Sequence, residues 1–505
     1  MFDAPTSPAD DVIHHFFATP LNTLLAERQA GNPEEKALAL FRRCIAEVPA
    51  YVDFLRSRGI DPVEINSCSA FRKLPLMGKA DYMQAYPLPE RCLGGSLKGS
   101  DRVAVSSGST GRPTFWPRSA LHELDVAIRF EQVFHDSFQA HRRSTLAVVC
   151  FALGNWVGGL YTTSCCWHLA AKGYPLLVAT PGNNKAEIFR VVRELAPHFE
   201  QTVLLGYPPF VKDVVDAGLA EGIDWPRYNP KLVFAGEVFS EEWRSLMAQR
   251  IDSSAPCHDS ASLYGTADGG VLGNETPLSI AIRRWLARHP EAARRLFGES
   301  RLPTLVQYDP ISRFFEVHEG TLVVSGENSV PLVRYHIADK GGLISFEDMW
   351  DFLKEYGLST TSELGLNADF QPRNLPFVYV FGRADFTVSY YGANIYPENV
   401  TVGLEQTEIQ AWATGKFVLE TQETGNGDKY LHVVVELLPG VEADSRMANV
   451  MAESIRSQLL RLNSEFANYT PVERQLPRVT LRPFSDSDYF PAGVKHRYTR
   501  RKPEQ

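Results

Sequence analysis

Short apolar runs alternate with helix-like segments through the middle of the chain. A buried parallel strand is a continuous run of apolar, often β-branched residues, whereas an amphipathic helix spaces its apolar residues three or four positions apart. The alternation predicts βαβ units, and hence a largely parallel sheet covered by helices on both faces. The expected strands are 145–151, 175–180, 202–206 and 231–235, and the expected helices are 120–138, 185–199 and 210–221.

The pattern changes toward both ends of the chain. Residues 1–100 are predicted to be mainly helical, over 21–29, 34–48 and 51–59. After the alternating region we expect a charged, exposed helix over 284–297 and a separate β-rich unit with strands at 321–325 and 332–335. An insertion is expected over 344–373, beginning with the acidic amphipathic stretch 346–356. Beyond Gly382, strands at 417–420 and 431–438 and a long helix at 441–464 predict a compact α+β unit.

Composition limits the classes of protein to consider. A chain of 505 residues is too long for one hydrophobic core, so several domains are expected. A net charge of −9 argues against a general nucleic-acid binder. Seven cysteines without a C-x-x-C motif argue against a disulfide framework or a Cys₄ zinc site and favour the reducing cytoplasm. The acidic N-terminus does not resemble a secretory signal.

One long stretch, 144–171, contains no Asp, Glu, Lys or Arg and has to be tested as a membrane span. Its apolar run at 146–152 is broken by Gly154, Asn155 and Trp156 before a helix-like segment follows. A buried strand, a loop and a packed helix explain this pattern better than a membrane span, and no membrane partner is expected.

The segment 106–114, Ser-Ser-Gly-Ser-Thr-Gly-Arg-Pro-Thr, packs hydroxyls, two glycines and a cation into one turn after a strand-like run. Glycine N–H groups approach an anion closely, hydroxyls add donors, and an arginine fork suits phosphate oxygens. A flexible Ser/Gly loop is the alternative, although such linkers rarely end in a basic residue and a proline. The candidate phosphate-binding residues are Ser106, Ser107, Gly108, Ser109, Thr110, Gly111 and Arg112.

Two further segments carry groups suited to a nucleotide. In 264–268, Tyr264 could stack on a base, Thr266 could bind a phosphate oxygen and Asp268 could hold Mg²⁺, which prefers hard oxygen ligands. A glycine-rich turn with an exposed Asp is the alternative. Asp339 stands at the end of an apolar strand, where a carboxylate can accept two hydrogen bonds from a ribose diol or cap a turn.

Three more segments complete the set of candidates. Arg383 and Asp385 lie in Gly-Arg-Ala-Asp-Phe (382–386), which is followed by Tyr-Gly-Ala-Asn-Ile-Tyr-Pro (391–397). Ala235, Gly236 and Glu237 lie in Phe-Ala-Gly-Glu-Val-Phe-Ser (234–240), and Phe151 precedes Trp-Val-Gly-Gly (156–159). Taken singly, residues of the last two segments are more often plain core than pocket.

In this order the segments resemble motifs of the adenylate-forming enzymes, the acyl-CoA synthetase superfamily. The segment 106–114 is similar to SSGTTGKPT, 264–268 to Y-G-x-[ST]-E, and 334–339 to R-Y-R-T-x-D. The segments 382–386 and 391–400 resemble G-R-x-D-D and R-G-x-N-[IV]-[FY]-P-x-x-[IV]-E of the phenylacetate-CoA ligase branch. The resemblance spans about residues 40–505.

The resemblance implies an α/β fold. Its large N-terminal adenylation domain, 1–384, would have mainly parallel sheets covered by helices plus a small β unit, and its small mobile α+β C-terminal domain, 385–505, would swing about Asp385. It implies ATP, Mg²⁺ and CoA as cofactor, metal and co-substrate. The resemblance implies that the nucleotide is bound by the loop 106–112 together with Gly236, Glu237, Tyr264, Gly265, Asp339 and Arg383, and the metal by Asp268. It implies an acyl pocket formed by Phe151, Trp156, Tyr161, Ala235, Gly236 and Tyr264. The residues implied in catalysis are Thr266, Arg383 and Lys495.

Lys495 is the least regular of these matches. The superfamily carries a lysine in a G-K-x-x-R phrase that bridges carboxylate and phosphate, whereas here Val494 takes that position and Lys495 comes one residue later. A solvated basic tail, or a contact with CoA phosphates, are the alternatives.

The implied reaction activates a carboxylic acid, aryl or arylacetic from the aromatic pocket residues, as an acyl-adenylate and passes it to CoA. An amine acceptor is a second hypothesis, motivated by the 344–373 insertion and by Val494. A nucleotide-binding protein on a decayed ligase fold is the non-enzyme alternative, motivated by Asp268, Phe386 and Val494. The sequence leaves the oligomeric state open, a homodimer included.

Overall fold

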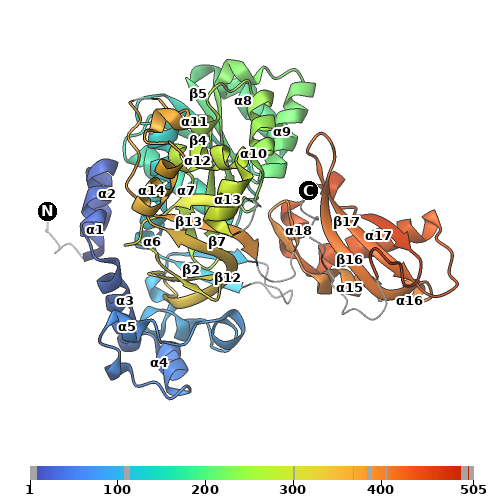
Figure 1. Ribbon diagram of the computed structural model, residues 1–505, viewed down its shortest axis with the longest axis horizontal. Helices are drawn as coiled ribbons and strands as arrows, with labels where there is room; N and C mark the ends of the chain where they lie inside the picture. The colour runs from blue at the N-terminus through green and yellow to red at the C-terminus, as the bar shows by residue number, and fades with distance from the viewer. Residues whose placement is uncertain are drawn as a thin grey trace.

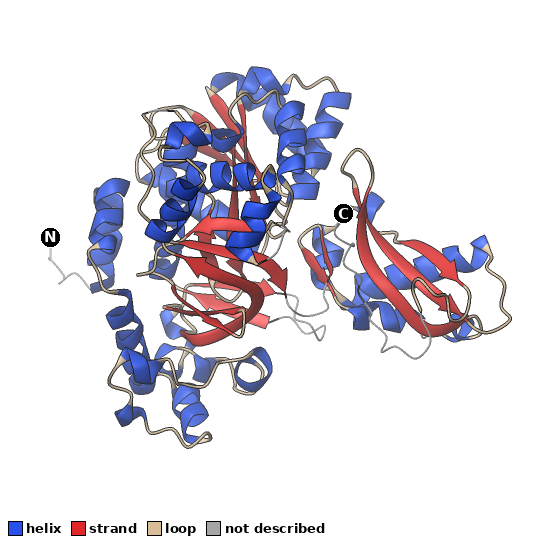
Figure 2. Ribbon diagram, viewed as in Figure 1, coloured by secondary structure: helices blue, strands red, loops and turns tan. Residues whose placement is uncertain are grey.

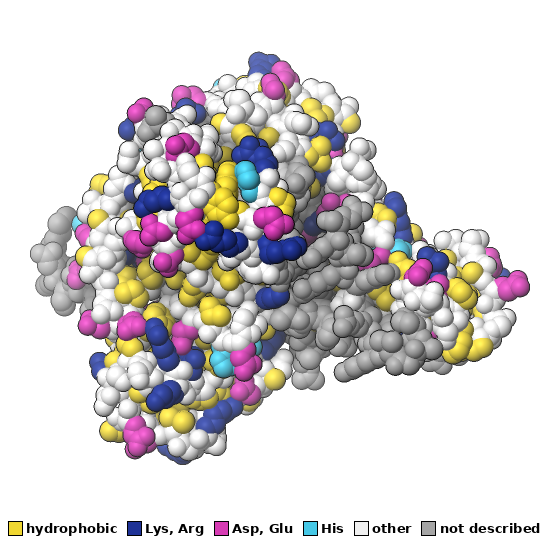
Figure 3. All heavy atoms as spheres, in the orientation of Figure 1, with side chains coloured by type: hydrophobic (Ala, Val, Ile, Leu, Met, Phe, Trp, Pro, Cys, Tyr) yellow, Lys and Arg dark blue, Asp and Glu magenta, His cyan; other side chains and the backbone are white. Residues whose placement is uncertain are grey.

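The computed structural model describes residues 8–106, 114–298, 302–367, 369–383, 388–404, 406–490 and 499. The described chain forms a large N-terminal unit, up to residue 383, and a small C-terminal unit beside it, from residue 388 (Figure 1). On the face in Figure 3, acidic and basic side chains are interspersed and no large area of one sign stands out among the coloured atoms.

Five helices open the described chain, and three of them correspond to the helices expected over 21–29, 34–48 and 51–59. The third shows why they form: Asn32 caps it by accepting hydrogen bonds from the backbone N–H groups of Glu34 and Glu35, Pro33 begins it, and two acidic residues stand in its first turn. The helices are α1 (Pro8–Ala18), α2 (Leu21–Gln29), α3 (Pro33–Glu47), α4 (Pro49–Arg56) and α5 (Cys68–Phe71).

An eleven-stranded sheet in the order β10-β11-β12-β13-β9-β8-β7-β6-β5-β3-β4 forms the centre of the N-terminal unit. The pairs between β7, β6, β5, β3 and β4 are parallel, and the other pairs are antiparallel. The strands are β3 (Thr145–Val149), β4 (Leu176–Ala179), β5 (Gln201–Gly206), β6 (Pro230–Ala235), β7 (Ser260–Thr266), β8 (Gly270–Asn274), β9 (Thr304–Gln307), β10 (Phe314–His318), β11 (Thr321–Gly326), β12 (Leu332–Ile344) and β13 (Phe377–Arg383).

All four strands expected in the alternating region are present, and helices connect them and cover both faces of the sheet (Figure 2). β3 is buried along its whole length, and a packed helix follows it in the chain. This confirms the interpretation of the charge-free stretch 144–171 as a buried strand, a loop and a packed helix. None of the helices in the described ranges combines the length and apolarity needed to cross a membrane. The helices are α6 (Ala120–Gln132), α7 (Val157–Ala171), α8 (Lys185–Leu195), α9 (Pro208–Ala220), α10 (Glu241–Arg250) and α11 (Pro256–Asp259).

Two expectations for the second half of this unit need correction. The strands expected at 321–325 and 332–335 exist as β11 and β12, but they belong to the large sheet rather than to a separate β-rich unit. The charged helix expected over 284–297 is two helices, α12 (Pro277–Ala287) and α13 (Pro290–Phe297), because Pro290 begins a new helix. α12 is largely buried, since its arginines have partners inside the protein.

The stretch expected as an insertion begins with α14 (Phe346–Glu355), which lies between β12 and β13 in the chain. Met349, Phe352 and Leu353 on this helix share a core cluster with α12 and α13. A separate two-stranded hairpin, β1 (Arg102–Ser106) and β2 (Thr114–Arg118), flanks the segment 107–113.

The C-terminal unit is the α+β unit that the sequence predicts. In its three-stranded sheet, β16 pairs antiparallel with β17, and β17 pairs parallel with β18. Its elements are β14 (Val388–Tyr390), β15 (Ala393–Ile395), α15 (Pro397–Leu404), α16 (Thr407–Gln410), β16 (Ala413–Glu423), β17 (Lys429–Leu437), α17 (Ser445–Leu462), α18 (Ser464–Tyr469) and β18 (Arg478–Arg482).

Candidate active site

Several predicted residues meet beside the carboxyl ends of the parallel strands. Ala235 ends β6 and Thr266 ends β7, the strand next to it. In open α/β sheets, ligands bind in the crevice outside these strand ends. The site is therefore where the topology of the sheet would place one.

Tyr264 and Asp339 are in direct contact although 75 residues separate them in the sequence. The Tyr264 hydroxyl donates to Oδ2 of Asp339 over 2.7 Å. Asp339 is in register with Arg383 across β12 and β13, so three of the predicted nucleotide-binding positions lie together. Asp339 is buried and lies next to an irregular part of β12.

Asp339 does not stand at a strand end as expected, because β12 continues to Ile344. The strand is irregular around Asp339: Ala338, directly before it, has φ of 66°, and the register to β13 shifts between Lys340 and Gly341. Bulges of this kind re-aim a side chain next to a functional site.

Hydrogen bonds hold the segment 266–269, which follows Tyr264 in the chain. Gly269 N–H donates to the Thr266 hydroxyl over 3.0 Å, and the Tyr335 hydroxyl donates to the Asp268 carboxylate. The buried Arg118 guanidinium donates to the backbone carbonyls of Ala267 and Asp268. A Cβ at Gly265 would stand 2.5 Å from the Gly270 carbonyl oxygen, so glycine is required there.

The hairpin that flanks the predicted phosphate loop is tied to the same place. On one strand, Val105 N–H donates to the Asn155 carbonyl over 2.8 Å and forms a bridge with Trp156. On the other strand, Arg118 makes the contacts to Ala267 and Asp268. Of the loop itself, the backbone of Ser106 ends β1, whereas Ser107, Gly108, Ser109, Thr110, Gly111 and Arg112 lie outside the described residues.

The segment after β6 meets the C-terminal unit. Gly236 has φ of 87°, and a Cβ there would stand 2.9 Å from the Tyr207 ring. The Glu237 side chain is 1% exposed and accepts hydrogen bonds from Gly392 N–H (2.5 Å) and from Lys429 Nζ (2.9 Å). In this arrangement the carboxylate predicted to line the nucleotide site is engaged by the neighbouring unit.

Aromatic rings gather where an acyl pocket is predicted. Phe151 meets Tyr207 edge-on with ring centroids 4.8 Å apart, and Trp156 meets Tyr469 edge-on at 5.1 Å. Tyr207 and Tyr469 are 5.0 Å apart, so one chain of rings joins the two units. Tyr161 lies elsewhere: its hydroxyl is 2.7 Å from His122 Nε2, behind β8, and its described contacts do not include this cluster.

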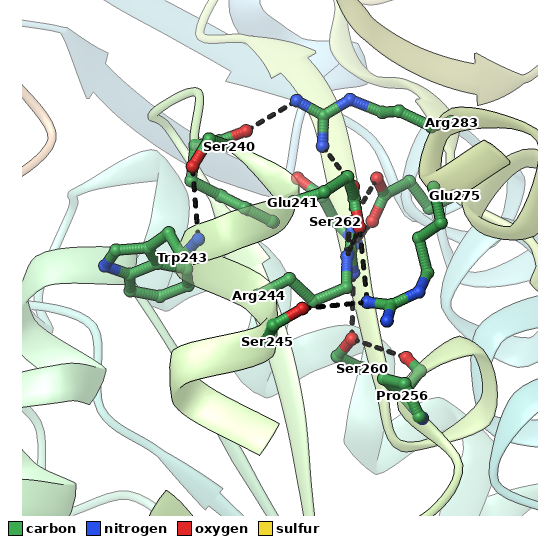
Figure 4. Close-up of polar contacts among 12 residues, drawn as sticks. Ser240, Glu241, Trp243, Arg244, Ser245, Pro256, Ser260, Ser262, Glu275 and Arg283 are labelled. Carbon is green, nitrogen blue, oxygen red and sulfur yellow. Dashed lines mark hydrogen bonds and ion pairs between the residues drawn. The ribbon is translucent and has the colours of Figure 1, made fainter. Parts of the chain in front are cut away.

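A buried polar network fixes the strand that carries Tyr264 (Figure 4). Arg244 on α10 donates to Glu241, to the Ser260 hydroxyl (2.8 Å) and to Glu275 (2.6 Å). Glu275 in turn accepts from Ser262 N–H over 2.7 Å, so both Ser260 and Ser262 of β7 are anchored.

The same network holds the segment that follows Glu237. Arg283 on α12 donates to the Glu241 carboxylate and, over 2.5 Å, to the Phe239 carbonyl. Ser240 caps α10 by accepting from Trp243 N–H. Every charge in the network has a partner, as buried ions require.

Acid should destabilise the fold through this network. Burial alone raises the pKa of Glu241, but the charges of Arg244 and Arg283 outweigh it, so that pKa lies below the ordinary value of 4.5. The unfolded chain therefore takes up this proton first, and the contribution to stability is complete above pH 4.5 and lost as the pH falls through the lowered value.

Urea unfolding at several pH values between 7 and 3 tests this expectation. Glu241→Gln should unfold more easily than the wild type at pH 7, and the difference should shrink steadily below about pH 4.5 because the wild type loses the same charge. Two stability curves that stay parallel over the whole range would contradict it.

Besides the loop residues 107–112, some further predicted site positions cannot be followed. Asp385 and Lys495 lie outside the described residues, and for Arg383 and Ser106 the backbone alone is described. Sequence reasoning missed Tyr207, Tyr469 and Lys429. Tyr207 has a signal, since it directly follows a predicted buried strand at the ligand-binding end of the sheet; Tyr469 and Lys429 have none, because their role depends on how the two units meet.

No protein-family model matches the chain. The chain is 24% identical over 260 residues to the phenylacetate-coenzyme A ligase of Aromatoleum evansii, an alignment that covers 49% of this chain. The alignment spans 54% of that ligase's own length, so it includes about half of the relative.

Solved structures match over nearly the whole chain. A 2-hydroxyisobutyryl-CoA ligase in complex with 2-HIB-AMP and CoA, in the thioesterification state, is 14% identical and covers 99% of this chain and 94% of its own, with a TM-score of 0.63. The same ligase in the postadenylation state with 2-HIB-AMP is 14% identical and covers 93% of this chain and 88% of its own, with a TM-score of 0.52.

Proposed function

We propose that this chain, which has the fold of the adenylate-forming acyl-CoA ligases, activates a carboxylic acid with ATP and transfers the acyl group to CoA. The observation that carries the proposal is the contact of Tyr264 with Asp339, in register with Arg383 and beside the stem of the segment 106–114. Three positions predicted separately to serve one nucleotide, Tyr264, Asp339 and Arg383, thus lie together, and Arg118 of the strand after segment 107–113 contacts the neighbouring Ala267 and Asp268.

In the first half-reaction, a carboxylate oxygen of the acid attacks the α-phosphorus of ATP. The bond to the β-phosphate oxygen breaks, pyrophosphate leaves, and an acyl-adenylate forms. Tyr264 offers an aromatic face to the adenine, and Asp339 accepts hydrogen bonds from the ribose hydroxyls. Because no covalent intermediate with the protein is needed, catalysis consists of positioning and charge neutralisation, in which Thr266, Arg383 and Lys495 take part.

Asp268 is suited to a Mg²⁺ ion that ATP itself brings. Mg²⁺ in such sites is held mainly by phosphate oxygens and water, with one or two protein carboxylates. When bound, the ion would neutralise charge on the phosphates. The Tyr335 hydroxyl orients Asp268 for this role.

In the second half-reaction, the CoA sulfur attacks the acyl carbon after its thiol proton is lost to solvent, and AMP leaves. CoA is proposed as the acceptor because the two units superpose, with a TM-score of 0.63, on a ligase whose structure holds 2-HIB-AMP and CoA. The aromatic rings of Phe151, Tyr207 and Trp156 favour an aryl or arylacetic acid.

The proposal is tested by offering the protein Mg²⁺, ATP and a panel of aryl, arylacetic and short aliphatic acids. We expect acyl-AMP and pyrophosphate, detected by mass spectrometry, with at least one acid, and acyl-CoA with AMP once CoA is added. Acyl-AMP that is consumed with amines but not with CoA would overturn the acceptor. Binding of ATP by calorimetry without pyrophosphate from any acid would overturn the activity itself.

A further inference from the structure

Beside the aromatic rings that join the two units, charged side chains also connect the C-terminal unit with the N-terminal unit. Lys212 on α9 is 1% exposed and lies 2.6 Å from Asp216 and 2.9 Å from Asp428, which stands in the turn between β16 and β17. Arg474 of the C-terminal unit lies 3.5 Å from Asp213 on α9. Ion pairs at an interface favour opening, because each partner regains water when the units part.

Glu237 lies at the centre of this interface. One of its oxygens accepts from Gly392 N–H over 2.5 Å and the other from Lys429 Nζ over 2.9 Å. Burial alone lowers the pKa of Lys429, but the Glu237 carboxylate outweighs it and holds that pKa above its ordinary value, so the amine stays charged. The side chains are 1% and 14% exposed, so this is a buried ion pair between the units.

The pair connects the nucleotide side of the site with the loop of the C-terminal unit. Glu237 follows Gly236, and a Cβ at Gly236 or at Gly392 would stand within 2.9 Å of the same Tyr207 ring. Both glycines have positive φ, 87° and 83°. The loop that contains Gly392 therefore lies directly against the segment after β6, and the contacts of Glu237 hold it there.

We infer that Lys429 and Glu237 are positioning residues for acyl transfer: their ion pair holds the 391–392 loop against the adenylate site while CoA attacks. This inference rests on the proposed function. The pair exists in the arrangement that resembles the thioesterification state, and it separates in any arrangement that turns the C-terminal unit away. Removing Lys429 leaves a buried carboxylate without its counter-ion, so the docked arrangement loses population.

The experiment compares Lys429→Met with Lys416→Met in the full-length protein. Lys416 lies in the same unit and also forms an ion pair, with Glu436, but its side chain is 47% exposed and its described partners, Glu436 and the Phe484 ring, belong to the C-terminal unit. Both variants remove one charge from the C-terminal unit, so the control separates the position of the charge from its loss.

Two rates are measured with the acid that the panel identifies. Without CoA, a single turnover of acyl-AMP formation should change less than twofold in either variant. With CoA added to preformed acyl-AMP, thioester formation should slow at least tenfold in Lys429→Met and stay near wild type in Lys416→Met. Lys429→Arg, which keeps the charge, should restore most of the rate. Equal slowing of both half-reactions, or no slowing in Lys429→Met, would overturn the inference.

A second measurement does not depend on activity. In hydrogen–deuterium exchange, amides of 208–220 and 424–431 should exchange faster in Lys429→Met than in the wild type or in Lys416→Met, because the interface opens. Unchanged exchange would overturn the inference even if the enzyme forms thioesters. Conversely, a wild type that forms no acyl-AMP with any acid refutes the proposed function, whereas the exchange result still reports on the ion pair.

Discussion

Asp339→Ala is expected to lower kcat/KM for ATP by about 100- to 10,000-fold. A carboxylate that accepts two hydrogen bonds from a ribose diol makes two charge-assisted bonds, each contributing about 1.5–3 kcal/mol, and the variant loses both. Asp339 lies at the end of the Tyr264 hydrogen bond and in register with Arg383, so its replacement also removes the acceptor that orients the Tyr264 ring. Steady-state kinetics with ATP varied at saturating acid and CoA measure the effect.

Tyr264→Phe is the matched control. It keeps the ring and removes the hydroxyl that donates to Asp339, so the loss should be a small fraction of that in Asp339→Ala. The use of 2′-deoxy-ATP separates contact with the ribose from a structural role. The wild type should discriminate against 2′-deoxy-ATP, and Asp339→Ala should use the two nucleotides with nearly equal kcat/KM. Unchanged discrimination in the variant would show that Asp339 does not touch the ribose.

The buried strands of the parallel half could be predicted because each is a short apolar run between helices. Residues 202–206 and 231–235 illustrate this, since their strands differ from the expected bounds by only a residue. The membership of β11 and β12 in the same sheet could not be predicted, because antiparallel pairing over long distances in sequence leaves no local signal. The break at Pro290 was readable from the sequence, and a single exposed helix was the wrong interpretation.

Some residues of the site could be predicted from the sequence, and some of its contacts could not. Tyr264, Asp339 and Arg383 were predicted individually from the groups they carry and from the resemblance, and the structure brings their positions together. The partners of Glu237 were unpredictable, because Lys429 is 192 residues away and belongs to another unit. Spacing along the chain reports local geometry, whereas this contact depends on docking of two separately folded units.

Arg244→Met is expected to cost about 3–5 kcal/mol of unfolding free energy, the usual penalty for breaking a buried ion pair on one side. Arg244 is 1% exposed and bonds to two carboxylates, of which Glu275 is itself 1% exposed. Methionine fills much of the same volume, so the loss reflects unpaired charge more than a cavity. Urea unfolding at pH 7 measures it.

Arg190→Met is the control, since Arg190 also pairs with two carboxylates, Glu187 and Glu194, but its side chain is 57% exposed. Water screens that pair, so its loss should barely change the unfolding transition. The double variant Arg244→Met/Glu275→Gln should be more stable than the sum of the single effects, because the second change removes the stranded charge. Equal losses at positions 244 and 190 would contradict the argument.

The network that Arg244→Met disrupts also positions residues of the candidate active site. Arg244 holds Ser260, and Glu275 holds Ser262, so the network fixes the two residues of β7 that precede Tyr264 with the same side-chain direction. A variant that stays folded at low temperature should therefore bind ATP several-fold more weakly than the wild type, a smaller loss than in Asp339→Ala, because every group that touches the nucleotide remains and its alignment alone is loosened. Full ATP affinity in folded Arg244→Met would show that the network contributes to stability but not to nucleotide binding.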